Sequence, residues 1–414
     1  MGSHSTAKLP SAFRRLAWSN LAAQSAEQIG LAATPIVAVL AFGAGAGATG
    51  LLQTAHTLPF LLMSIPAGVV ADRMSRAKLM ASAEALRVAS LLAILVLIAF
   101  GGLTLPLLAG LGFLGACGTV AYSVAAPALV PALVKPAALP VANGRIELAR
   151  TIAFAAGPAI GGALVGWMGG GPAFAAAAAL SIFAVVLLVG LREPPRAPTP
   201  TKHPWQDLRE GAAFVFRHPL LRPILVTQFI FNVAFFMIQA AYVPFAIGAL
   251  GLTPAGVGMT LGAFGAGMVT GALAAAAIMR VLSLGIVIAI GPISGFLAAL
   301  VMALTIWTPS PLFAGLSFFL MGAGPLVWVV STTTLRQTVT PQHLLGRVSA
   351  INSAVYGARP IGAALGAMVG GLYGAEACLI LAAVGFLAQM VVILASPVPA
   401  LGREPTRAAS AANG

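Results

Sequence analysis

Residues 49–71 read TGLLQTAHTLPFLLMSIPAGVVA and residues 77–100 read AKLMASAEALRVASLLAILVLIAF, with the charged sequence DRMSR between them. The hydrocarbon core of a bilayer is about 30 Å thick, and a helix needs about 20 apolar residues to cross it. Each run meets that length. Two such runs joined by a few charged residues predict a pair of transmembrane helices connected by a short exposed loop.

The rest of the chain has the same character. Of its 414 residues, 59% are hydrophobic and 7% are charged, and the mean hydropathy is +1.00. A water-soluble domain carries about 25% charged residues, so most of this surface must face lipid rather than water. Transmembrane β-barrels alternate polar and apolar residues along each strand. The long unbroken apolar runs exclude that class and predict an all-α membrane protein.

The same length criterion predicts twelve transmembrane helices. They span residues 16–42, 49–71, 77–100, 104–130, 141–168, 171–191, 220–248, 254–279, 284–306, 310–335, 345–371 and 373–396. The chain then divides into a six-helix half, 1–191, a hydrophilic linker, 192–219, and a second six-helix half, 220–414. The proline-rich start of the linker predicts extended backbone. Its later part, from Trp205, predicts a short amphipathic helix on the membrane surface.

Lysine and arginine fall on one side of this arrangement. The turns near 43–48, 101–103, 169–171, 248–253, 308–310 and 372–375 contain neither residue, whereas the other turns, the linker and the termini carry them. Positive residues remain on the cytoplasmic side of a membrane protein. We therefore expect a bacterial-type inner-membrane protein with both termini in the cytoplasm. The net charge of +13 indicates topology and contact with lipid headgroups, not binding to nucleic acid.

No pattern typical of catalysis or metal binding is present. The two cysteines, Cys117 and Cys378, lie inside apolar runs, and the five histidines are scattered. Neither a His-Glu-x-x-His sequence nor a phosphate-binding loop occurs. We therefore expect no enzymatic activity, no metal and no cofactor. Transport energy must come from an ion gradient, with the proton gradient as the first candidate, or from the substrate gradient itself.

The two halves show traces of an internal repeat. In the fifth predicted helix Arg145 precedes Pro158, and in the eleventh Arg347 precedes Pro360 at the same spacing, each arginine following a glycine. Parallel repeats of six helices are a known plan for transporters, with the substrate site at the interface of the halves near the membrane midplane. The repeat predicts a pseudo-symmetric molecule with a central site.

The loop between the second and third predicted helices carries Gly68, Asp72, Arg73 and Arg76. This spacing resembles the signature loop of the major facilitator superfamily, although Ser75 stands where that family usually has glycine. The resemblance implies the two-half, twelve-helix fold of that superfamily and a gating role for the loop. Gly68 is expected to permit close helix approach, and Asp72 to face a helix N-terminus or a cation.

A second motif concerns the direction of transport. The fifth predicted helix is similar to the small-residue motif of drug/proton antiporters in the same superfamily, and this similarity implies export; it consists of Ala153, Gly157, Pro158, Gly161 and Gly162. Proline in a helix interior removes a hydrogen bond and favours a kink. The alternative interpretation is plain helix packing. Residues 340–350, which include Arg347, resemble the branch that contains siderophore (enterobactin-type) and macrolide exporters.

Charged residues at membrane depth are costly and mark functional sites. Glu27 is the first candidate for proton coupling, because burial disfavours a charged carboxylate and so favours proton binding. Its alternative role is a structural hydrogen bond. His56 and Glu147 are the further proton-coupling candidates, and His56 titrates near neutrality in principle.

Two pairs of charged residues and one single arginine are assigned to structure or gating. Glu84 and Arg87, and likewise Glu147 and Arg150, are three residues apart and are predicted to pair. We expect both pairs to form a gating network with Asp72. Arg359 has no acidic residue nearby in the sequence, so it needs a partner from another helix, an anionic substrate or a water-filled cavity.

The superfamily resemblance implies that helices 1, 4, 7 and 10 line the central cavity. The polar and aromatic residues on these helices are therefore the candidates for substrate contact: Asn20, Gln24, Tyr122, Gln228, Asn232, Gln239, Tyr242, Trp328 and Thr332. An apolar cavity with few fixed charges suits a bulky amphipathic ligand.

These observations predict a monomeric secondary transporter that works by alternating access. We expect it to export an amphipathic drug or siderophore in exchange for protons. The alternatives are an importer or facilitator of a small metabolite, and a non-transporting membrane receptor or lipid translocator.

Reporter fusions test the predicted topology. A reporter placed after Arg196, and a second at the C-terminus, should both give a cytoplasmic signal, because positive charge surrounds both sites. A periplasmic signal at either site would overturn the assigned orientation.

Overall fold

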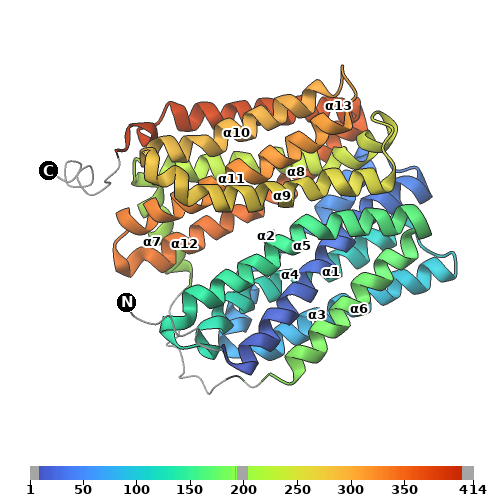
Figure 1. Cartoon of the computed structure of the whole chain (residues 1–414), viewed down its shortest axis with the longest axis horizontal. Helices are drawn as coiled ribbons and strands as arrows, with labels where there is room; N and C mark the ends of the chain where they lie inside the picture. The colour runs from blue at the N-terminus through green and yellow to red at the C-terminus, as the bar shows by residue number, and fades with distance from the viewer. Residues whose placement is uncertain (1–8, 192, 194–203, 403–414) are drawn as a thin grey trace.

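The computed structural model describes residues 9–191, 193 and 204–402, and in these residues it contains helices but no strand. The longer helices are α1 (Ser11–Phe42), α2 (Ala46–Arg73), α3 (Arg76–Ala99), α4 (Leu105–Leu133), α5 (Leu139–Met168), α6 (Gly170–Val189), α7 (Pro204–Arg217), α8 (Leu221–Gly248), α9 (Pro254–Val281), α10 (Leu284–Leu304), α11 (Pro311–Val339), α12 (Leu345–Ala354) and α13 (Ala358–Leu394). Figure 1 shows their arrangement.

The all-α membrane prediction is confirmed. Within the described ranges, 10 helices are long and apolar enough to cross a membrane. Gly374, with φ 86° and ψ 172°, interrupts α13 and divides it into limbs 358–373 and 375–394, close to the last two predicted spans. The predicted count of twelve stays a prediction. The division of the chain at 192–219 does so too, since residues 192 and 194–203 lie outside the described part.

Two predicted boundaries need correction. Helix α1 begins at Ser11 rather than at 16, so the arginines at its start belong to the helix. The predicted span 345–371 is interrupted by a short 3-10 turn, Val355–Gly357, between α12 and α13. The predicted amphipathic segment of the linker does form a helix, α7.

Glycines make the tight turns at one end of the molecule. Among the described residues only glycines have positive φ, and they stand in the turns that carry no lysine or arginine: Gly43, Gly101, Gly169, Gly251 and Gly374. Left-handed backbone is open to glycine without steric penalty. We call this the glycine-turn end. The opposite end carries α7, the start of α1 and the end of α13 (Figure 1), and we call it the linker end.

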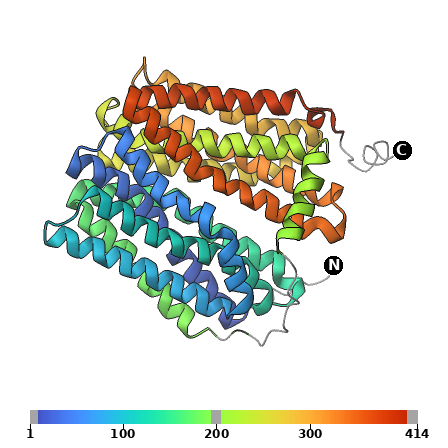
Figure 2. The ribbon, with the colours of Figure 1, turned by 180° about the vertical axis from the view of Figure 1, so that it is seen from behind.

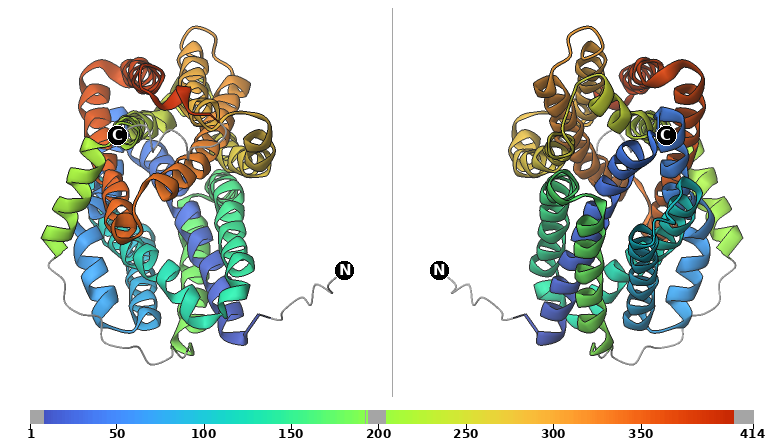
Figure 3. Two further views of the ribbon diagram at one scale, coloured as in Figure 1. Left: turned by 90° about the vertical axis from the view of Figure 1, so that its left-hand side faces the viewer. Right: turned by 90° about the vertical axis from the view of Figure 1, so that its right-hand side faces the viewer.

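The helices pack in two groups with matching order. In the first group α1 contacts α5, α2 contacts α4, and α3 contacts α6; in the second α8 contacts α13, α9 contacts α11, and α10 contacts α13. Between the groups α2 contacts α13 and α5 contacts α9, which are equivalent pairs in a repeat. Figure 2 shows α2 beside α13, and Figure 3 shows the two groups one above the other.

Small residues bring the two groups together at the glycine-turn end. A Cβ atom added to Gly50 of α2 would lie 2.5 Å from the Cα atom of Ala367 in α13. A Cβ atom added to Gly162 of α5 would collide with the carbonyl oxygen of Pro254 and lie 2.8 Å from the Cα atom of Gly258, both in α9. The Thr49 hydroxyl donates a hydrogen bond to the carbonyl oxygen of Ala240, 2.7 Å away in α8. Close approach of this kind depends on residues without bulky side chains. In Figure 1 the groups meet at this end and diverge toward the linker end.

Enlarging Gly50 tests this contact. In protein whose native cysteines are replaced by serine, Gly50→Leu should raise the labelling of Thr49→Cys by a water-soluble maleimide several-fold, because the side chain forces α2 and α13 apart. Gly110→Leu is the matched control, since no described atom lies within 4 Å of a Cβ at Gly110. Equal labelling in the two variants would show that this contact does not close the molecule.

Candidate functional site

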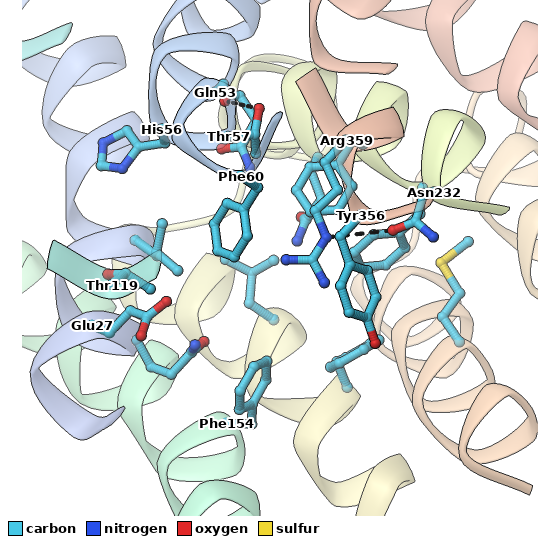
Figure 4. Close-up of a pocket in the computed structure, with 18 of the residues that line it drawn as sticks. Glu27, Gln53, His56, Thr57, Phe60, Thr119, Phe154, Asn232, Tyr356 and Arg359 are labelled. Carbon is cyan, nitrogen blue, oxygen red and sulfur yellow. Dashed lines mark hydrogen bonds between the residues drawn. The ribbon is translucent and has the colours of Figure 1, made fainter. Parts of the chain in front are cut away.

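A cavity of about 710 Å³ lies between the two groups of helices. Its lining comes from α1, α2, α3, α4 and α5 of the first group and mainly from α8, α11 and α9 of the second, with Arg359 from the start of α13. Pockets for small organic molecules have volumes of about 300–1,000 Å³. The cavity extends to residues near the linker end, where Ser353 and Tyr356 are exposed. Figure 4 shows its central part.

One wall of the cavity is aromatic. Phe231 and Phe235 of α8 are stacked with their ring centroids 5.6 Å apart, and Phe235 also meets Phe236 and Phe264, each at 5.5 Å. Residues four apart on a helix share one face, so the spacing of Phe231 and Phe235 places both rings together. Aromatic rings give a large apolar contact area, and this wall fits the ring system of an organic molecule.

Arg87 of α3 is the centre of a buried polar cluster. Its Nη1 atom donates hydrogen bonds to Glu84 Oε1 at 2.6 Å and to the carbonyl oxygen of Ala23 at 3.1 Å. Its Nη2 atom donates to the hydroxyl of Thr119 in α4 at 2.6 Å. The side chain of Glu84 is fully buried and that of Arg87 is 7% exposed. A buried carboxylate needs such a partner, because removing a charge from water is costly.

Glu27 is the carboxylate of this cluster that faces the cavity. Its Oε2 atom lies 3.7 Å from Arg87 Nη2, beyond the range of a strong hydrogen bond, and its side chain is 20% exposed. Glu27 lines the cavity, whereas Glu84 does not. The two carboxylates therefore differ: Arg87 binds Glu84 closely and holds Glu27 by a longer electrostatic contact.

The other proton-coupling candidates also line the cavity. His56 of α2 packs against Gly112 of α4, and its Nε2 atom has no hydrogen-bond partner among the described residues. Glu147 pairs with Arg150, with Oε1 2.5 Å from Nη2, and both side chains are partly exposed. The predicted pairing of residues three apart is thus present in both cases.

Arg359 enters the cavity from the start of α13. Its Nε atom donates a hydrogen bond to Asn232 Oδ1 at 3.4 Å. Its Cζ atom lies 4.3 Å from the ring centroid of Tyr356, 4.9 Å from that of Phe60 and 5.4 Å from that of Phe236. Figure 4 shows the Arg359 guanidinium among the side chains of Phe60, Tyr356 and Asn232.

The structure divides the candidate substrate contacts into two sets. The cavity lining includes Gln228, Asn232, Gln239, Trp328 and Thr332. It does not include Asn20, Gln24, Tyr122 and Tyr242. Tyr242 is fully buried and its hydroxyl group is hydrogen bonded to Thr260. Asn20 contacts the Ile146 carbonyl oxygen of α5, and Tyr242 contacts α9, so these side chains point from cavity-lining helices toward neighbouring helices. Helix membership alone does not specify that rotation. A substrate-binding role for the first set stays a prediction.

The small-residue motif of α5 lies in close helix contacts. A Cβ at Gly157 would lie 2.5 Å from that of Gln28, and a Cβ at Gly161 would lie 2.8 Å from the carbonyl oxygen of Ile29, both in α1. Gly162 meets α9, and Pro158 lines the cavity. The motif is therefore in contact with both helix groups.

The loop motif is held within the first group. Glu193 Oε2 accepts hydrogen bonds from the Ser75 hydroxyl at 2.9 Å and the Arg76 amide at 2.7 Å. Arg73 is exposed. The close approach expected at Gly68 is not seen, since no described atom lies within 4 Å of a Cβ built there.

Two gating assignments remain predictions. The side chain of Asp72 lies outside the described residues, so its network with the ion pairs stays untested. Arg347 of α12 forms an ion pair with Glu210 of α7. This contact connects the linker helix to the second helix group.

Sequence reasoning missed several cavity residues. Phe60 and Tyr356 flank Arg359, Thr119 binds Arg87, and Arg336 lies toward the linker end. The expected set was taken from helices 1, 4, 7 and 10, whereas Phe60 is on α2 and Tyr356 is in the turn before α13. Thr119 on α4 and Arg336 at the end of α11 lie on two of the expected helices and were not selected. The isolated arginine in the eleventh predicted helix was the signal that could have directed attention to its aromatic neighbours.

Two matched helix groups around a central cavity, in an all-helical membrane chain, define a transporter of the major facilitator type. The signature of the family described as transmembrane secretion effector matches residues 11–412, and the chain belongs to this family of MFS-type transporters. It is a multi-pass integral membrane protein and a transporter of that type.

A curated relative and several solved structures are similar. An uncharacterized MFS-type transporter of Sinorhizobium fredii is 28% identical over 257 residues, which cover 58% of this chain and 60% of that protein. The match thus spans less than two thirds of the relative.

Solved structures at low identity show the fold. A POT family transporter in complex with a thioalcohol-conjugated peptide gives a TM-score of 0.73 at 13% identity, covering 94% of this chain and 96% of that one. A bacterial homologue of the iron transporter ferroportin in an inward-facing state gives 0.69 at 15%, covering 92% and 98%. The nucleoside transporter NupG gives 0.73 at 13%, covering 93% and 99%.

The Arg87 cluster gives a stability prediction. Arg87→Met should lower the free energy of unfolding by about 3–5 kcal/mol, because it leaves the Glu84 carboxylate buried without a counter-charge. The double variant Glu84→Gln with Arg87→Met should recover most of that loss. Thermal unfolding of purified protein in detergent measures both. A double variant no more stable than Arg87→Met would show that the ion pair does not account for the effect.

Proposed function

We propose that the protein is a proton-coupled exporter of amphipathic small molecules, of drug or siderophore type, that works by alternating access. The observation that carries this proposal is Glu27, a carboxylate in the wall of a largely apolar cavity, 3.7 Å from Arg87. It acts as a monomer in a bacterial inner membrane, with both termini cytoplasmic and the linker end facing the cytoplasm.

Proton coupling follows from the contacts of Glu27. A coupling acid must bind and release a proton inside a cavity that opens to alternate sides of the membrane. Glu27 suits both needs, because it is partly exposed to the cavity. Arg87 has Glu84 as its close partner, and we expect it to keep that partner whether Glu27 is charged or protonated. Proton binding neutralises Glu27 without leaving Arg87 unpaired. This arrangement supports Glu27 as the coupling residue and Glu84 as a structural one.

Export is supported by two observations. The family description refers to secretion. In addition, the small-residue motif of α5 touches α1 at Gly157 and α9 at Gly162, so a shift of α5 changes contacts within and between the helix groups. A surface of small residues permits such a shift, because few side chains interlock across it.

The aromatic wall supports an amphipathic substrate. Phe231, Phe235 and Phe264 offer ring surfaces, while Gln228 and Gln239 add hydrogen-bonding groups to the same cavity. Such a mixture suits a bulky molecule with an apolar body and a few polar groups.

Proton flux in proteoliposomes tests the coupling. With an imposed pH gradient and a panel of hydrophobic cations, macrolides and siderophores, a transported compound should trigger proton movement in native protein. Glu27→Gln should reduce that movement at least about tenfold, a lower bound beside the roughly 100- to 10,000-fold that a positioned proton-transfer group contributes in catalysis. Glu376→Gln, which alters an exposed acid outside the cavity, is the matched control.

Other results would redirect the assignment. Equal proton flux in Glu27→Gln would exclude Glu27 and leave His56, Glu147 and Asp72 as candidates. Compound flux without proton movement would contradict proton coupling and favour a facilitator. Compound movement only in the direction that corresponds to entry into the cell would favour an importer. A compound that binds without flux would indicate a receptor, and lipid movement alone would indicate a translocator.

A further inference from the structure

Arg359 is a cavity charge that lacks a counter-charge among the described residues. No carboxylate of the described residues lies within 4 Å of it, and its polar partner is the neutral amide oxygen of Asn232. The nearby acids already have partners: Glu84 and Glu27 contact Arg87, and Glu147 contacts Arg150. A positive charge at membrane depth without a counter-ion is unfavourable, so an anion entering the cavity gains from this site.

The cavity as a whole is also positive. Among the described residues, its lining contains two acids, Glu27 and Glu147, and four arginines, Arg87, Arg150, Arg336 and Arg359. The buried Glu84 offsets one further charge through Arg87. An organic cation entering this space meets net repulsion, whereas an organic anion meets attraction, which water in a narrow apolar cavity screens poorly.

The surroundings of Arg359 leave its donors available. Three aromatic rings surround the Cζ atom, those of Tyr356, Phe60 and Phe236, and Nε is engaged by Asn232. The Nη1 and Nη2 groups donate no hydrogen bond to a described residue. A guanidinium presents such groups in a fixed fork that matches the oxygens of a carboxylate, sulfonate or phosphate.

We propose that the substrate is an amphipathic organic anion whose oxyanion binds Arg359 while its ring system lies on the aromatic wall formed by Phe231, Phe235 and Phe264. This inference rests on the proposed export function and names its substrate class. An anion leaving a cell whose interior is negative moves with the membrane potential, so its charge assists export.

Two dyes with the same xanthene ring system test this proposal. Fluorescein is an anion with a carboxylate, and a rhodamine methyl ester is a cation of similar shape. Fluorescence anisotropy with purified native protein in detergent should show that fluorescein binds at least about tenfold more tightly than the rhodamine ester. This is the range expected for one charge-assisted pair of hydrogen bonds.

Variants locate the binding group. Arg359→Gln should weaken fluorescein binding about tenfold or more and leave rhodamine ester binding unchanged or stronger, while Arg359→Lys should retain part of the preference. Arg280→Gln is the control, because Arg280 is exposed on α9 and lies outside the cavity lining. Thermal unfolding checks that each variant is folded. The native comparison of the two dyes holds even if Arg359→Gln does not fold.

The outcomes separate the two proposals. Equal binding of the dyes, or tighter binding of the rhodamine ester, would overturn the anion assignment and leave the exporter proposal standing. Fluorescein preference that survives Arg359→Gln in folded protein would overturn the role of Arg359. Arg359-dependent binding without fluorescein efflux from proteoliposomes, under a potential negative inside, would support the anion site and contradict the exporter.

Discussion

Lipid cannot solvate charge, and this constraint governs the interior of the molecule. Each charged side chain at membrane depth must meet a counter-charge, a polar neighbour or a water-filled space. Arg87 meets this need through Glu84, Thr119 and the carbonyl oxygen of Ala23, and so connects α3 with α4 and α1. Glu27 shares the same arginine at a longer distance. The cluster that stabilises the first helix group thus also holds the candidate proton carrier at the cavity wall.

A second constraint comes from helix packing. Helices in lipid gain little from burying apolar side chains, so they associate through small residues and close backbone contact. Gly50 against Ala367 and Gly162 against Pro254 make such contacts between the groups at the glycine-turn end. At these two points backbone approaches backbone without a large side chain between, and such a contact is one that a transporter could make and break. The opposite end, where the groups diverge, contains α7, the start of α1 and the end of α13 (Figure 1).

The sequence predicted the fold well because the apolar runs and the lysine and arginine pattern are long-range signals that need no tertiary detail. Site prediction was less complete for a geometric reason. Gln228 and Asn232 face the cavity while Tyr242, further along the same helix α8, is buried against α9 and α11. The period of an amphipathic stripe would normally tell such faces apart, but a helix surrounded by lipid and other helices is apolar on every side. The partners of Arg359 come from α2, α8 and the turn before α13, and their meeting depends on tertiary packing.

Alternating access around the central cavity is the central claim, and distances at the two ends test it most directly. Spin-label pairs at Gly102 with Trp307, near the glycine-turn end, and at Lys78 with Arg280, near the linker end, occupy exposed positions on opposite helix groups. The distances can be measured by pulsed electron paramagnetic resonance in nanodiscs, with pH and fluorescein concentration varied. We expect two populations: in one the distance at the glycine-turn end is long and that at the linker end short, and in the other the reverse. Distances that stay fixed under all conditions, or that lengthen together, would contradict the account.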